Sequence, residues 1–264
     1  MSRSELKSDI AEVLEDHTSV ALCLDFDGTL APIVSDPEEA TLPFRTRKIL
    51  ATLSEKPTVD ITIISGRALR DVRSRINIEG ISYAGNHGLE LLRDDHVWVH
   101  PDAEDCRESL ERICHRLESE LASISGCVIE DKYATAAVHY RRVDPEEIGS
   151  VIATVERLVD SEPTLRTTVS NKVVEIRPDT EYGKGAAVEA LAETGPNTLV
   201  SYLGDAETDV DAFRTLAAMK DPTIRVSVGE TLPASEYVLE TPADVRELLE
   251  WLLKEHDRLL QTRN

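Results

Sequence analysis

Two aspartates, Asp25 and Asp27, directly follow the apolar segment Ser19–Leu24. An apolar segment of this kind is typical of a strand buried on both faces, so both carboxylates are expected at the end of a buried strand. Two carboxylates so close together repel one another, and a hard divalent cation relieves that repulsion. Since the candidate ligands are oxygens rather than nitrogens or sulfurs, the pattern predicts Mg²⁺ as the cofactor.

Polar residues follow three further apolar segments in the same way. They are Ser65 and Arg67 after residues 59–64, Asn86 and His87 after residues 81–84, and Asp205 and Asp209 after residues 198–203. In an open parallel sheet, ligands bind beyond the carboxyl ends of the strands. We therefore expect all four clusters to lie at one edge of a sheet and to form a single site.

The carboxylates suit transfer of a phosphoryl group to water. Asp25 is predicted to attack phosphorus, giving an aspartyl-phosphate, and also to ligate the metal. Asp27 would be the general acid for the leaving alkoxide and then the base for the hydrolytic water, and its backbone carbonyl would be a metal ligand. Asp205 is the next predicted metal carboxylate. Asp209 is either a further ligand or a group that supports the ligands.

Two hydrogen-bond donors complete the predicted catalytic set. A metaphosphate-like transition state spreads negative charge over its equatorial oxygens. Ser65 and Lys184 are the donors that we expect to hold those oxygens. Lys184 lies between Gly183 and Gly185, which would let the backbone approach closely.

The order of the predicted elements indicates the fold class. Strands and helices alternate up to about residue 85 and again from residue 183, which predicts an α/β fold with a doubly wound, Rossmann-like parallel sheet. Between these parts, a long helix from about 103 to 123 opens a smaller α+β unit. Its strands are expected at residues 127–132, 134–142, 165–170 and 173–177. The prediction is a core of residues 1–100 and 180–264 with an inserted domain of residues 101–179.

Composition restricts the partners. The 264 residues carry a net charge of −21, with 50 acidic and 29 basic side chains, which disfavours nucleic acid and anionic membranes as partners. No apolar stretch approaches the ~18 residues of a membrane-spanning helix. The N-terminus has no apolar signal region, and the four cysteines have no paired spacing, so we expect a cytoplasmic protein with reduced thiols. The acidic, lysine-poor composition fits either a high-salt cytosol or an ordinary acidic protein.

The chemical motifs resemble those of a known enzyme superfamily. Asp25-Phe26-Asp27-Gly28-Thr29-Leu30 is similar to the first motif of haloacid-dehalogenase-type phosphatases. Ser65, Lys184 and Gly204-Asp205-x-x-x-Asp209 match the second, third and fourth motifs in order. The resemblance implies the residue roles given above, and the insert between the second and third motifs is similar to the type-two cap of that superfamily.

Narrower matches resemble the trehalose-6-phosphate phosphatase family. They are Leu30-Ala31-Pro32-Ile33, Gly85-Asn86-His87-Gly88-Leu89-Glu90, Glu130-Asp131-Lys132, His139-Tyr140-Arg141 and Val174-Glu175-Ile176-Arg177-Pro178. The resemblance implies that the sugar hydroxyls are met by Lys132, His139, Arg141 and Glu175 on the cap and by Arg67 and His87 on the core. Alternation along a strand would place His139 and Arg141 on one face and Tyr140 on the other. It would likewise turn Glu175 away from its neighbours Val174 and Ile176.

The fourth motif departs from the family pattern. Ala206 stands where a second acid is usual after Asp205, and Val210 stands where the family favours glutamate. The acidic ring is therefore thinner, which bears on metal affinity more than on the reaction.

Other functions remain open at this point. Within the same class, the substrate could be the phosphate of sucrose, glucosylglycerol or mannosylglycerate. A different class is a weakly active sugar-phosphate sensor or a partner of the trehalose-phosphate synthase, although the complete core residues argue against an inactive protein. The expected partner is a small-molecule sugar phosphate, and the expected state is a monomer.

Overall fold

The computed structural model describes residues 3–17, 19–34, 36–170, 172–192 and 197–263. The chain divides into two compact units. One contains the residues up to Val97 together with those from Tyr182 onward, and the other is Trp98–Glu181. The sequence had placed these boundaries after residues 100 and 179.

The larger sheet has eight strands in the order β12-β11-β10-β1-β2-β3-β4-β5. They are β1 (Ser19–Leu24), β2 (Val59–Ile64), β3 (Ser82–Gly85), β4 (Glu90–Arg93), β5 (His96–Val99), β10 (Thr198–Gly204), β11 (Thr223–Val228) and β12 (Tyr237–Leu239). Neighbouring strands from β12 to β3 are parallel. Strand β4 pairs antiparallel with β3, so the parallel part ends there.

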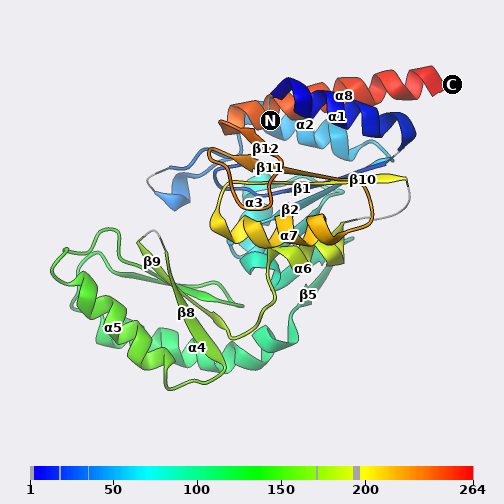
Figure 1. The fold of residues 1–264 in the computed structure, drawn as a ribbon. Helices are drawn as coiled ribbons and strands as arrows, with labels where there is room; N and C mark the ends of the chain where they lie inside the picture. The colour runs from blue at the N-terminus through cyan, green and yellow to red at the C-terminus, as the bar shows by residue number, and fades with distance from the viewer. Residues whose placement is uncertain (1–2, 18, 35, 171, 193–196, 264) are drawn as a thin grey trace. The chain divides into compact units, whose positions relative to one another are not determined.

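Helices cover both faces of this sheet (Figure 1). They are α1 (Arg3–Asp16), α2 (Phe44–Ser54), α3 (Leu69–Ile76) and α8 (Pro242–Arg263) on one face, and α6 (Lys184–Leu191) and α7 (Val210–Ala218) on the other. Strand β1 shows why its sequence is apolar at successive positions. Leu22 and Leu24 pack into the core on the first face, and Ala21 and Cys23 pack into the core on the second.

The described part of the first unit also contains three short 3₁₀ helices. They are η1 (Pro37–Glu39) in the connection after β1, η2 (Asn86–Gly88) after β3 and η3 (Glu207–Asp209) after β10. Both η2 and η3 begin at or just after the carboxyl end of a strand, which is the edge where the sequence predicts the site.

The second unit has an antiparallel sheet in the order β6-β7-β9-β8. Its elements are α4 (Pro101–Glu120), β6 (Val128–Asp131), β7 (Ala136–His139), α5 (Ile148–Val159), β8 (Leu165–Ser170) and β9 (Val173–Pro178). Residues of α4 and α5 pack on one face of this sheet around Val138, Val174 and Ile176. A large, mostly parallel α/β sheet with a smaller antiparallel α+β unit confirms the predicted fold class.

One predicted strand was too long. The sequence extended the strand that contains His139 to residue 142, but β7 ends at His139. Tyr140 is buried in the core of the second unit, and the backbone turns there, since Val143 N donates to Tyr140 O at 3.2 Å. Arg141 therefore lies in a turn, and the prediction that it shares a strand face with His139 was wrong.

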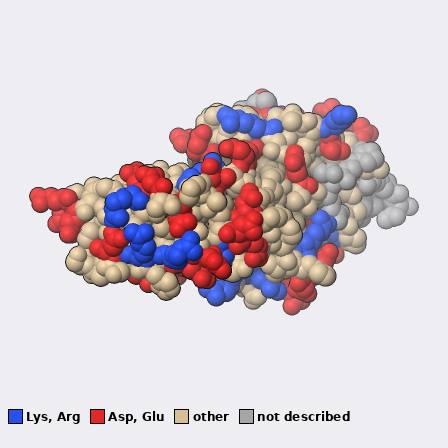
Figure 2. Space-filling view, turned by 90° about the horizontal axis from the view of Figure 1, so that it is seen from below, with Lys and Arg blue, Asp and Glu red and all other residues tan. Residues whose placement is uncertain are grey.

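Acidic residues outnumber basic ones by 50 to 29 in the sequence. Figure 2 shows acidic side chains scattered among basic ones on the face that it presents. The acidic residues are also spread along the sequence, so the net charge of −21 is not confined to one segment. Within the part of the chain that the structure describes, no helix has both the length and the apolar character needed to cross a membrane.

Candidate active site

The parallel register of β1 and β10 brings two of the predicted metal carboxylates together. Leu24 lies beside Leu203, and Asp25 N donates to Leu203 O at 2.9 Å. Asp25 thus leaves β1 next to the point where β10 leads into Asp205. One carboxylate oxygen from each of Asp25, Asp205 and Asp209 lies within 4.8 Å of the others.

Gly28 makes the close approach of Asp205 sterically possible. Its φ is +81°, and a Cβ at this position would lie 2.0 Å from Asp205 Oδ2. The turn is closed by Gly28 N, which donates to Ala31 O at 2.8 Å. A side chain at position 28 would therefore both strain the backbone and collide with the carboxylate of Asp205.

Lys184 links two of these carboxylates, those of Asp25 and Asp209. Its buried ammonium donates to Asp25 Oδ1 at 2.7 Å and to Asp209 Oδ1 at 2.6 Å. Burial alone would lower the pKa of Lys184, but the charges of Asp209 and Asp25 outweigh burial and raise it. The lysine therefore stays protonated and supplies a fixed positive charge at the end of β1.

Asp209 is fully buried, and its carboxylate accepts four hydrogen bonds. Oδ1 accepts from Lys184 and from the Tyr202 hydroxyl, which is 2.6 Å away. Oδ2 accepts from the backbone N of Asp205 at 3.0 Å and of Ala206 at 2.8 Å. With these contacts, Asp209 holds Lys184 and the turn that carries Asp205, which favours the supporting role that the sequence left open.

The charges of this cluster indicate what it can hold. Burial raises the pKa of Asp25 well above its usual value, against the lowering effect of Lys184, and Asp209 and Asp205 raise it further. Burial and the neighbouring Asp209 raise the pKa of Asp205 to about 6. Lys184 donates to only two of these three carboxylates, so a further cation would stabilise the ionised form of the cluster. Because every candidate ligand atom is a carboxylate oxygen, the set fits a hard cation such as Mg²⁺.

Two residues not named in the sequence analysis, Tyr202 and Asp211, contact residues of the candidate site. Tyr202 lies within β10, three residues before Asp205, and its hydroxyl reaches Asp209. Asp211 Oδ2 accepts from Gly185 N at 2.8 Å, at the first turn of α6. A Cβ at Gly183 would lie 2.7 Å from the same carboxylate oxygen. The glycines beside Lys184 thus make room for Asp211. For Tyr202, the feature of the sequence that could have indicated a role was a tyrosine within an otherwise apolar strand.

Ser65 and His87 lie side by side at the ends of β2 and β3. Ser65 N donates to Ala84 O and His87 N donates to Ser65 O, both at 2.9 Å. Gly66 allows this contact, since a Cβ there would lie 2.6 Å from His87 Cε1. The Ser65 hydroxyl accepts from Arg67 N at 3.2 Å. These two residues belong to the first unit with Asp25, as the sequence predicts.

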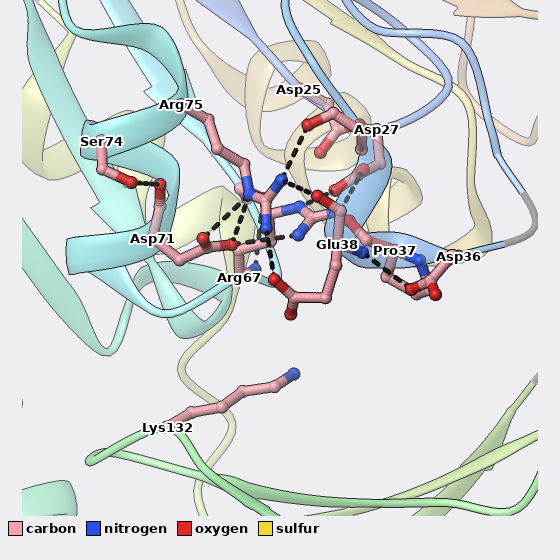
Figure 3. Close-up of polar contacts among 12 residues, drawn as sticks. Asp25, Asp27, Asp36, Pro37, Glu38, Arg67, Asp71, Ser74, Arg75 and Lys132 are labelled. Carbon is pink, nitrogen blue, oxygen red and sulfur yellow. Dashed lines mark hydrogen bonds and ion pairs between the residues drawn. The ribbon is translucent and has the colours of Figure 1, made fainter.

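Arg67 binds the carboxylate of Asp27 with two parallel hydrogen bonds. Nε donates to Oδ2 at 2.6 Å and Nη2 donates to Oδ1 at 2.8 Å (Figure 3). Asp27 is thereby held by Arg67, which follows the end of β2. In the sequence analysis, Arg67 is instead assigned to substrate binding.

The predicted substrate residues of the second unit pair with acidic neighbours. Lys132 Nζ lies 3.3 Å from Glu175 Oε1, and His139 Nε2 lies 2.9 Å from Glu130 Oε2. Glu130 was not among the predicted site residues. Glu175 is half-buried between the buried Val174 and Ile176, which confirms that it faces away from them. Arg141 is exposed in the turn after β7.

Comparisons with known proteins identify relatives. A family model described as trehalose-phosphatase matches residues 23–239. A trehalose-phosphate phosphatase of Mycobacterium tuberculosis is 35% identical over 243 residues, which cover 89% of this chain and 61% of that protein. A probable trehalose-phosphate phosphatase of Oryza sativa is 33% identical over 258 residues, with 89% and 69% covered. An uncharacterized glycosyl hydrolase of M. tuberculosis is 37% identical over 245 residues, with 88% and 18% covered.

The chain thus spans about a fifth of that glycosyl hydrolase and 61% of the M. tuberculosis phosphatase. Among solved structures, the C-terminal domain of the trehalose-6-phosphate phosphatase of Candida albicans aligns with a TM-score of 0.73 and 25% identity. That alignment covers 96% of this chain and 97% of that one. A haloacid dehalogenase-like hydrolase of Bacteroides thetaiotaomicron shares the fold, with a TM-score of 0.59 and 14% identity over 89% of this chain and 99% of that one. Because the family model matches most of the 264 residues, the chain belongs to the trehalose-phosphatase family.

Proposed function

We propose that this protein is a magnesium-dependent phosphatase that hydrolyses trehalose 6-phosphate to trehalose and phosphate. The observation that carries the proposal is the buried cluster in which Lys184 bridges Asp25 and Asp209 beside Asp205. Such a cluster combines a carboxylate nucleophile, a fixed cation and a metal-ligand set at the carboxyl end of a parallel sheet. The names of the relatives support the choice of substrate.

In the first step, an oxygen of the Asp25 carboxylate attacks phosphorus, and the bond from phosphorus to the sugar oxygen breaks. Asp27 gives a proton to the departing alkoxide. Lys184 and the Ser65 hydroxyl offer hydrogen bonds to the phosphoryl oxygens, where negative charge spreads in the transition state. The products of this step are trehalose and an aspartyl-phosphate on Asp25.

In the second step, Asp27 accepts a proton from water as the water oxygen attacks phosphorus. The bond from phosphorus to Asp25 breaks, which releases phosphate and restores the carboxylate. Asp25 and Asp205, with the backbone carbonyl of Asp27, would hold Mg²⁺. When bound, the ion supplies positive charge that keeps Asp25 ionised and offsets the charge of the phosphate.

Recognition of the sugar is assigned to residues of both units. Lys132, His139 and Glu175 lie on or beside the sheet of the second unit, in polar pairs that could exchange partners for sugar hydroxyls. Arg141 and His87 are proposed to contribute further contacts. On this view the inserted domain predicted at residues 101–179 is the cap domain of the enzyme. The monomeric state, the cytoplasmic location and association with a synthase stay predictions.

The proposal is tested by phosphate release from a panel of sugar phosphates, with magnesium and after its removal by a chelator. The expected result is magnesium-dependent turnover with the highest kcat/KM for trehalose 6-phosphate. A preference for the phosphate of sucrose, glucosylglycerol or mannosylglycerate would reject the substrate. Tight binding of the sugar phosphate without phosphate release would favour a sensor instead.

The nucleophile is tested by Asp25→Asn. This variant should lose turnover of every substrate while it stays folded, because a carboxamide cannot form the acyl phosphate. A matched control is Asp95→Asn. Asp95 is an exposed aspartate in the turn between β4 and β5, and its carboxylate lies 3.5 Å from Arg73. The control should keep wild-type kcat. Turnover that survives Asp25→Asn would contradict the assignment.

A further inference from the structure

Arg67 is the first of three charged residues in a row that begins just before α3 and continues along it. Arg67, Asp71 and Arg75 are spaced four residues apart, so they lie on the same side of the helix and its preceding turn. Asp71 Oδ2 accepts from Arg67 Nη1 at 3.0 Å and from Arg75 Nε at 2.8 Å (Figure 3). The carboxylate of Asp71 thus ties the two guanidinium groups together.

Both ends of this row are attached to the segment that follows β1. Arg67 Nη2 donates to Pro37 O at 2.9 Å. Arg75 Nη1 donates to Glu38 O at 2.9 Å and to Ala40 O at 2.8 Å. The two arginines of the row therefore bind the loop around η1 through three of its backbone carbonyls.

The surroundings of Arg67 leave its guanidinium little freedom. Its side chain is only 13% exposed and lies 5.6 Å from the centroid of the Phe26 ring. Asp27, Asp71 and the carbonyl of Pro37 engage four of its five N–H donors. At most one N–H is left for a sugar hydroxyl unless the bonds to Asp27 break.

Among the described residues, the hydrogen bonds recorded for the carboxylate of Asp27 come from Arg67. The side chain of Asp27 is 38% exposed. In the proposed function the same carboxylate gives a proton in the first step and takes one in the second, so its position matters in both. A two-bond guanidinium–carboxylate contact fixes the plane as well as the place of a carboxylate.

We propose that Arg67 is a positioning residue that holds Asp27 in place for both proton transfers, with Asp71 and Arg75 anchoring Arg67 to the loop after β1. This inference rests on the proposed function, because it assigns Arg67 a task within the same reaction. It differs from the role implied by family resemblance, in which Arg67 meets sugar hydroxyls. The two roles predict different kinetics.

The test compares Arg67→Gln and Arg67→Lys with wild type on trehalose 6-phosphate. Loss of a positioning residue should lower kcat at least ten-fold and leave KM within two-fold, since ground-state binding is unchanged. Lysine should not rescue, because its single ammonium cannot form the two parallel bonds. Asp71→Asn should give a smaller loss of kcat, about three-fold, because Asp27 and Pro37 still hold Arg67.

A double variant separates positioning from a general structural effect. If Arg67 acts through Asp27, then Arg67→Gln should cause no further loss of turnover in an Asp27→Asn background. A matched control is Arg73→Gln, since Arg73 lies on α3 with Asp71 and Arg75 but is 55% exposed and 3.5 Å from Asp95. The control should keep wild-type kcat and KM. Thermal unfolding of each variant shows whether it is folded.

A rise in KM with unchanged kcat would overturn the inference in favour of a sugar contact. Unchanged kcat and KM would overturn it as well, and so would an additive loss in the double variant. These outcomes are distinct from failure of the proposed function, in which wild type itself releases no phosphate or prefers another substrate. A wild type that prefers another sugar phosphate still allows the same comparison, with that substrate.

Discussion

At the scale of single residues, Tyr202 shows how the site depends on groups that carry no charge. It lies fully buried within β10, where its ring packs edge-on against Phe213 at 5.5 Å between centroids. Its hydroxyl is one of two donors to Asp209 Oδ1, and the other is Lys184. The tyrosine therefore steadies the carboxylate that positions the lysine.

We expect Tyr202→Phe to lower both stability and turnover. The ring contact is kept, but a buried carboxylate loses a donor, which costs about 1.5–3 kcal/mol of unfolding free energy. Turnover should fall about three- to ten-fold as Lys184 becomes less constrained. Urea unfolding and steady-state kinetics measure the two effects. Tyr83→Phe is the control, because the buried Tyr83 donates to Ile78 O at 2.8 Å, on the other side of the sheet, and should lose stability alone.

The residues of the candidate site were largely predictable, because their types and spacing form contiguous motifs. Asp25, Asp205 and Lys184 were named from the sequence and lie together in the structure. Tyr202 and Asp211 were not named, since each acts through a hydrogen bond to a segment whose distance along the chain says nothing of proximity. The bond between Arg67 and Asp27 joins residues 40 positions apart and was hidden for the same reason.

At the scale of elements, the position of Lys184 depends on how α6 begins. Gly183 precedes the helix without a side-chain cap, and the carboxylate of Asp211, from α7, takes that place at Gly185 N. A carboxylate at a helix N-terminus both satisfies a free N–H and suits the positive end of the helix dipole. The start of one helix is thus fixed by the first turn of another.

Asp211→Ala should therefore loosen the first turn of α6. Loss of a capping carboxylate costs about 1 kcal/mol of stability, and kcat should fall more than KM rises because Lys184 is the first residue of the helix. Denaturant unfolding and kinetics test this expectation. Glu189→Ala on the exposed side of the same helix is the control and should change neither. Equal behaviour of the two variants would show that Asp211 does not position Lys184.

Element boundaries were predicted less well than element types. Apolar periodicity identified the strands of the larger sheet, where burial on both faces dictates the sequence. It placed the end of β7 three residues too late, because Tyr140 looks like a strand residue whether the chain continues straight or turns. The turn is set by packing of Tyr140 in the second unit, which periodicity does not report.

At the scale of the whole molecule, contacts between the C-terminal helix and the start of β2 close the first unit. His256 of α8 is buried, and its Nε2 lies 2.6 Å from Thr58 Oγ1. Asp257 and Lys56 form an ion pair beside it at 2.7 Å. Burial lowers the pKa of His256, against the opposing effect of Asp257, and Lys56 lowers it further.

This shift predicts a loss of stability in mild acid. A histidine whose pKa is lowered on folding contributes nothing above its unfolded value, about 6.5. As the pH falls through that value, the unfolded chain binds a proton that the folded chain resists, so the free energy of unfolding decreases. His256→Gln removes the proton site, and the variant should therefore lose less stability than wild type between pH 7.5 and pH 5.5.

The comparison must be made as a difference, because a carboxylate whose pKa is raised on folding changes the free energy of unfolding with pH in the opposite direction. Burial raises the pKa of Asp205 to about 6 and also raises that of Glu90. Protonation of either group therefore increases the free energy of unfolding as the pH falls. Subtracting the variant from wild type cancels their contribution. The same measurement on His115→Gln, at a histidine that is 82% exposed on α4, is the matched histidine-to-glutamine control. Parallel unfolding curves for wild type and His256→Gln at all pH values would show that the C-terminal contact stays intact when His256 is protonated.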